Sequence, residues 1–108
     1  MLRARYLQSM PAKHAALEAA WREVLRVPSE PSLRELHDLV HRLLGSAPTY
    51  GCEAIGRCAR AVDASLREDE DDRDDSLAEG ARIAERIAIP MQALLDSLAQ
   101  AAQDTTEP

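Results

Sequence analysis

The sequence predicts an all-α fold of one domain, and three observations lead to that prediction. The chain has 108 residues, which is enough for one hydrophobic core but not for two. Hydrophobic residues make up 45% of it and aromatic residues only 3%, and the commonest residues, Ala, Leu, Arg and Glu, form helices readily. The marks of β-strands, alternating β-branched or aromatic residues between Asn-Gly or Asp-Gly turns, are absent from the sequence.

The first helical stretch is expected from about residue 4 to residue 26. Pro11 either divides a short leading turn from a longer helix or lies in the first turn of that helix, where its missing N–H leaves no hydrogen bond unmade. Helical spacing predicts a buried face that comprises Tyr6, Leu7, Met10, Leu17, Trp21, Val24 and Leu25. Residues 27–32, which include two prolines, are expected to form a loop.

The second helix opens with a capping-box signal, because Ser32 is followed three residues later by Glu35. Its predicted buried stripe comprises Leu33, Leu36, Leu39, Val40, Leu43 and Ala47. On the same helical wheel His37, His41 and Arg34 share another face, so both histidines are expected to point away from the core or along its edge. Residues 48–51 are expected to form a turn or a loosened helix end.

A third helix is expected over about residues 52–68, with Ile55, Cys58 or Ala59, Val62 and Leu66 buried. After an acidic connection, Ser76 and Glu79 form a second capping box that opens a long last helix. The buried stripe of that helix is predicted to comprise Leu77, Ala84, Ile87, Met91, Leu94 and Leu98.

The stripe of the last helix is close to a heptad repeat, which suits nearly parallel packing in a bundle, and Pro90 is expected to kink it. Short connections between amphipathic helices favour antiparallel neighbours. We therefore expect an antiparallel four-helix bundle over residues 1–103, with room for a short additional N-terminal helical turn. Residues 104–108 are expected to be a flexible tail or the start of a linker.

Negative charge is concentrated in residues 68–75, which hold seven acids and one arginine. Without them the 13 Lys and Arg and the 19 Asp and Glu of the chain reduce to 12 of each. A net charge of −6 without a basic stripe argues against nucleic acid as a partner. No signal peptide or apolar run of membrane-spanning length is evident, and Cys52 and Cys58 are too far apart on one helix to bridge. We therefore expect a cytoplasmic protein without membrane insertion.

The residues suited to chemistry lie in positions 41–51, HRLLGSAPTYG. His41 comes late in an amphipathic helix, and a neutral imidazole is a nucleophile near pH 7. Gly45 follows one turn later on the same face, although glycine inside a helix costs about 1 kcal/mol relative to alanine. It either leaves space for an incoming partner or ends the helix as a C-cap. The local pattern leaves open whether His41 is a nucleophile or a surface residue without a role.

The same stretch resembles the signature of histidine-containing phosphotransfer (Hpt) domains, His-x-Leu-Lys-Gly-Ser-Ala with a further glycine a few residues later. The positions that match it one by one are His41, Leu43, Gly45, Ser46, Ala47 and Gly51. The resemblance covers most of the chain and implies a four-helix bundle in a bacterial-type two-component phosphorelay. Its histidine takes a phosphoryl group from one receiver-domain aspartate and gives it to another. Such domains do not hydrolyse ATP, so we expect a phosphocarrier with no catalytic activity of its own, no cofactor and no metal.

The resemblance makes His41 the expected phosphoacceptor and Gly45 the residue that gives clearance. Leu44 stands where the family has a lysine that offsets the phosphoryl charge. Arg34 and Arg42 are candidates to replace that charge, because guanidinium groups pair well with phosphate oxygens.

His37 is a candidate neighbour that tunes or hydrogen-bonds near His41. The exposed surface around Leu44 and Pro48 is expected to help dock a receiver domain of a response regulator or hybrid sensor kinase.

Two alternatives stay open. One is a helical docking or scaffold module whose histidine is never phosphorylated. The other is a metal site on His37 and His41, because HDLVH places two imidazoles one turn apart as zinc metalloproteases do. That motif needs Glu where this chain has Asp38, and it needs a third ligand, for which His14 is the one remaining histidine.

Overall fold

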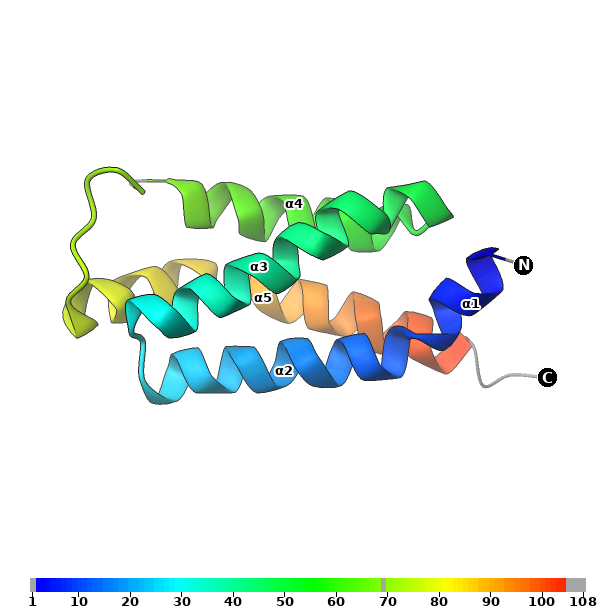
Figure 1. Cartoon of the computed structure of the whole chain (residues 1–108), viewed down its shortest axis with the longest axis horizontal. Helices are drawn as coiled ribbons and strands as arrows, with labels where there is room; N and C mark the ends of the chain where they lie inside the picture. The colour runs from blue at the N-terminus through cyan, green and yellow to red at the C-terminus, as the bar shows by residue number, and fades with distance from the viewer. Residues whose placement is uncertain (1, 69, 105–108) are drawn as a thin grey trace.

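A computed structural model describes residues 2–68 and 70–104, and it consists of helices joined by short connections (Figure 1). In chain order the elements are α1 (Leu2–Gln8), α2 (Met10–Arg26), α3 (Glu30–Ser46), the 3-10 turn η1 (Pro48–Tyr50), α4 (Glu53–Arg67) and α5 (Leu77–Asp104). The described residues contain no β-strand, so the all-α prediction is confirmed. Helices α2 to α5 run antiparallel in the ring order α2, α3, α4, α5, and α1 packs at one end of the bundle.

Each of the four long helices contributes an apolar face to one shared core. The stripe predicted for α3 is confirmed, since Leu36 and Val40 are fully buried and the other residues of the stripe are buried or partly buried. Burying a Leu, Ile or Met side chain contributes about 1.5–3 kcal/mol, so these contacts are the main source of stability. The largest fully buried side chains are Met10, Leu17, Leu33, Leu36, Leu66, Ile83, Ile87, Met91, Leu94, Leu98, Val24 and Val40.

Two leucines that were predicted to lie in the core are exposed instead. Leu25 is 58% exposed, because it follows the fully buried Val24 by one residue and therefore lies about 100° farther around α2. Leu77 is 55% exposed, because it begins α5 at the end of the bundle. One turn later the buried Gly80, and not a large apolar side chain, packs against the chain at Pro28.

The N-terminus of α3 lies three residues earlier than the predicted cap. Ser29 is the N-cap, and its Oγ accepts a hydrogen bond from the backbone N–H of Ser32 at 3.2 Å. Pro31 fits the first turn because no helical acceptor exists there for the N–H that proline lacks. Ser32 is buried, and its hydroxyl donates to the carbonyl oxygen of Val27 at 2.7 Å. This bond holds the α2–α3 connection against the helix.

Pro11 combines both roles left open for it. A break at Ser9 separates the seven-residue α1 from α2, and Pro11 lies in the first turn of α2. The short additional N-terminal helix is therefore present.

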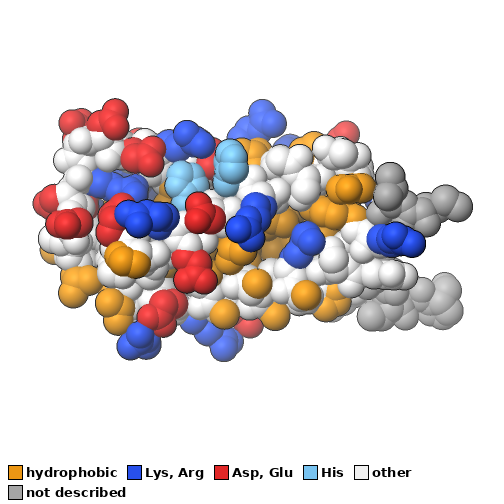
Figure 2. Space-filling view, viewed as in Figure 1, with side chains coloured by type: hydrophobic (Ala, Val, Ile, Leu, Met, Phe, Trp, Pro, Cys, Tyr) orange, Lys and Arg blue, Asp and Glu red, His pale blue; other side chains and the backbone are white. Residues whose placement is uncertain are grey.

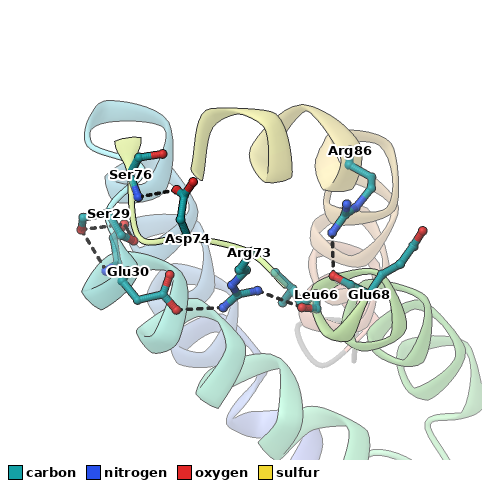
Figure 3. A network of polar contacts seen from close by, with 9 residues as sticks. Ser29, Glu30, Leu66, Glu68, Arg73, Asp74, Ser76 and Arg86 are labelled. Carbon is teal, nitrogen blue, oxygen red and sulfur yellow. Dashed lines mark hydrogen bonds and ion pairs between the residues drawn. The ribbon is translucent and has the colours of Figure 1, made fainter. Parts of the chain in front are cut away.

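Two arginines hold the acidic connection between α4 and α5 against the bundle (Figure 3). The Arg73 side chain is only 9% exposed, and it donates to the carbonyl oxygen of Leu66 at 3.0 Å and to the carboxylate of Glu30 at 2.9 Å. Arg86 of α5 donates to the carbonyl oxygens of Ser65 at 2.9 Å and of Glu68, the residue that follows α4, at 3.2 Å. The last carbonyls of a helix have no partner within the helix, and these guanidinium groups satisfy them in α4.

The capping box predicted for α5 is confirmed, because Ser76 Oγ accepts a hydrogen bond from the backbone N–H of Glu79 at 3.1 Å. The helix continues through Pro90 to Asp104. The kink at Pro90 stays a prediction, and residues 105–108, in which most of the predicted tail falls, lie outside the described residues.

Candidate functional site

His41 is exposed on the side of α3 that turns toward α4. The preceding residue, Val40, is fully buried, and one step along the helix rotates the next side chain by about 100°. The direction of that rotation is toward α4, because His37, one turn earlier on the same face, contacts Asp63 of α4. Figure 2 shows histidine side chains at the surface, with Lys, Arg, Asp and Glu side chains around them. The predicted exposure of His41 is thus present in the structure.

His37 pairs with α4 and not with His41. Its Nε2 donates to Oδ1 of Asp63 at 2.8 Å, and Arg67 Nε donates to Oδ2 of the same carboxylate at 2.9 Å. The side chains of His37 and Asp63 are 19% and 10% exposed. Burial raises the pKa of Asp63, but the hydrogen bonds from His37 and Arg67 outweigh this effect and leave that pKa below its ordinary value. The group therefore cross-links α3 and α4 next to the exposed histidine.

Asp63→Asn is expected to destabilise the fold by about 1–3 kcal/mol, because two donors lose a charged acceptor in a largely buried position. The lowered pKa means that the carboxylate stabilises the folded state above the ordinary Asp pKa of about 4, and that this contribution is lost as pH falls through the folded-state value. Urea denaturation from about pH 7 down to about pH 2 measures both effects. The difference between wild type and variant should shrink with acid, whereas equal losses for Asp63→Asn and the exposed Asp38→Asn would contradict the prediction.

Gly45 lies inside α3, one turn after His41, and a Cβ built there would meet nothing within 4 Å. The helix continues to Ser46, and the left-handed residue of this stretch is Gly51, with φ of 79°. The C-cap role considered for Gly45 is therefore wrong. Packing against neighbouring residues does not require a glycine at this position. The surface beside Gly45 is open to solvent and to an approaching partner.

Gly45→Ala is expected to stabilise the fold by about 0.5–1 kcal/mol, because alanine has the higher helix propensity and its methyl group meets no neighbour. Thermal or urea denaturation measures the change. A loss of stability would mean that the fold itself requires glycine here.

The two arginines considered as substitutes for the family lysine lie away from His41 in different directions. Arg34 lies two turns earlier and lines an open polar hollow with His37 and the acidic connection. Arg42 lines an open groove between α2 and α3, beside Leu39. Both side chains are exposed, and neither forms an ion pair within residues 2–68 and 70–104.

Leu44 lies in the last turn of α3, and Pro48 comes just after that helix. Leu44 is partly buried and packs against the core, so only part of its side chain is available to a partner. Pro48 is exposed and begins η1, and its Cγ lies 2.9 Å from the position that a Cβ on Gly56 would take. Because Gly56 has no side chain, η1, which follows α3, packs close against α4.

Comparison with protein-family models matches the Hpt domain to residues 1–104. The chain belongs to the Hpt domain family. Hpt domains are histidine phosphotransfer modules of phosphorelays, act as phosphocarriers and not as catalysts, and interact with receiver domains of two-component systems. No curated protein and no solved structure matched the sequence.

In this Hpt domain the helix α1 is held against the end of the signature stretch, a contact that sequence reasoning missed. The hydroxyl of Tyr6 hydrogen-bonds Ser46 Oγ at 2.6 Å, and the Tyr6 ring stacks on Tyr50 with centroids 4.4 Å apart. Burial raises the pKa of Tyr6, so the phenol stays protonated at neutral pH. The sequence offered one hint of this stacking, since Tyr6 and Tyr50 are its two tyrosines.

The geometry of this Hpt domain offers little to the alternative metal site. His37 commits Nε2 to Asp63, and the described residues hold no group of three or more His, Cys, Asp or Glu side chains placed to bind a metal ion. Cys52 and Cys58 are both free thiols. In the described part of the chain, none of the helices combines the length and the apolar character needed to cross a bilayer.

Proposed function

We propose that this Hpt domain relays phosphoryl groups between receiver-domain aspartates and that His41 is the residue phosphorylated. The observation that carries the proposal is the exposed His41 ring within the matched signature, one turn before a glycine that meets nothing within 4 Å. The other histidines suit the role less well. His37 is largely buried against Asp63, and His14 lies on α2, outside the signature.

In the proposed step the lone pair of His41 Nε2 attacks the phosphorus atom of a receiver aspartyl phosphate. The new N–P bond forms as the P–O bond to the carboxyl group breaks, and aspartate leaves as a carboxylate. The ring is then cationic until Nδ1 releases its proton to solvent. The reverse sequence on a second receiver regenerates neutral His41 and a new aspartyl phosphate.

This transfer depends mainly on access and alignment, because the attacking and leaving atoms must lie in line with phosphorus. Helix α3 holds the direction of the ring, and Gly45 leaves the neighbouring surface open to the receiver. We assign the exposed Pro48 and the accessible part of Leu44 to docking, and Arg34 and Arg42 remain candidates for long-range attraction of the phosphorylated partner.

The test is incubation of the domain with a receiver that carries radioactive phosphate on its aspartate. The expected product is an acid-labile, base-stable label on the domain, as phosphohistidine requires, within the peptide that contains His41. The absence of such a label with several active receivers would overturn the proposal.

The docking or scaffold alternative has one specific observation in its favour, the apolar Leu44 at the position of the family lysine. On that function the domain binds receivers but takes up no phosphoryl group. Binding without labelling in the same experiment would favour it.

A further inference from the structure

Two contacts define how α3 and α4 lie along one another. His37 hydrogen-bonds Asp63 at 2.8 Å, and at the other end the ring of Pro48 packs against Gly56. The two helices are antiparallel (Figure 1), so residues between these pairs face each other in reverse order. His41 lies four residues after His37, and the residue four before Asp63 is Ala59, which is buried, so Arg60 is the exposed residue of α4 next to the level of His41.

Arg60 also lies on the correct side of α4. Gly56, Asp63 and Arg67 form the face of α4 that meets α3, and Arg60 belongs to the same face at a spacing of three and four residues. Helices pack about 8–10 Å apart. The side chains of Arg60 and His41 are both exposed, so they border the same outer edge of the α3–α4 contact from opposite helices.

The surroundings of Arg60 leave its charge available. Together with Arg57, it lines an open hollow beside Pro48, and the acid of this hollow, Glu53, lies nearly two helical turns from Arg60. Arg60 forms no ion pair within the described residues. By contrast, Arg67 is bound to Asp63.

We infer that Arg60 contacts the phosphoryl oxygens on His41 and supplies from α4 the positive charge that the family lysine would supply from α3. The inference rests on the proposed phosphorylation of His41. A phosphoryl group carries a charge of about −1.5 to −2 near pH 7, and a guanidinium group donates two parallel N–H bonds to such oxygens. Arg60 forms no covalent bond in the transfer; it stabilises the charge on the product.

The test compares Arg60→Ala with Arg22→Ala, a matched control in which an exposed arginine is removed from α2. Each variant is mixed with phosphorylated receiver, and the partition of label between free receiver and free Hpt domain is measured at equilibrium. Arg60→Ala is expected to shift this partition toward the receiver by about 3–10-fold, the effect of losing one partly screened charge-assisted contact. Arg60→Lys should restore most of it, and Arg22→Ala should match wild type.

The outcomes separate the two proposals. A wild-type domain that takes up no label overturns the phosphoryl relay itself. Normal wild-type labelling with the same partition for Arg60→Ala and Arg22→Ala overturns the role of Arg60 and leaves the relay standing. A slower approach to an unchanged partition would also overturn it, because receiver docking affects the rate but not the equilibrium between free species.

Discussion

His41→Gln is expected to lower phosphoryl uptake from a phosphorylated receiver by at least about a thousandfold, to the background of the assay. Glutamine is similar in size but has no nucleophilic ring nitrogen, so no N–P bond can form. The wild-type side chain is exposed and the change removes no core contact, so the free energy of unfolding should change by less than about 0.5 kcal/mol. The variant thus separates the chemistry from the fold.

Label incorporation over time measures the uptake, and urea denaturation confirms that the variant is folded. His14→Gln is the matched control, since it removes a histidine from α2 and should be labelled at the wild-type rate. Label on His41→Gln at the wild-type rate would show that another residue accepts the phosphoryl group. Retained receiver binding and unchanged pathway output in a cell that carries the variant would favour the scaffold function.

Gly80→Ala is expected to destabilise the domain by about 3 kcal/mol or more, the largest effect on stability that we predict for one methyl group. A Cβ on Gly80 would overlap the carbonyl oxygen of Pro28 and would lie 2.8 Å from the carbonyl carbon. These are backbone atoms in the α2–α3 connection, which the bond from Ser32 to the Val27 carbonyl holds in place. The clash can be relieved only by separating α5 from that connection.

Urea denaturation of Gly80→Ala beside Gly45→Ala isolates this clash. Both substitutions gain helix propensity, by about 1 kcal/mol, but only the first meets a neighbour. The two variants should therefore change stability in opposite directions. Stabilisation by both would mean that the α2–α3 connection yields to the added methyl group, against the prediction.

The sequence predicted the core of α3 correctly because hydrophobic periodicity is a local property. Leu33, Leu36, Val40, Leu43 and Ala47 repeat at helical spacing, and any packed helix with that pattern must bury that face. The N-terminus of the same helix was predicted wrongly. Several serines and prolines precede it, and the choice among them depends on the Val27 carbonyl that accepts from Ser32 in the folded chain.

The candidate site divides in the same way. The signature around His41 and Gly45 is contiguous, so its residue types and their common helical face could be recognised from spacing alone. His37 shares that face, yet its partner Asp63 lies 26 residues away, and the interaction between them exists only once α3 and α4 are packed.

The sequence by itself thus determined the helical class and most of each buried stripe, since both depend on residues within a few turns of one another. The tertiary structure decided which charged groups of different helices meet, and why only one of the two histidines of α3 is largely buried. It ties His37 to Asp63 and leaves Arg60 as the inferred charge near His41, because the register between antiparallel helices depends on contacts such as that of Pro48 with Gly56. Such contacts join distant segments, and no local pattern specifies them.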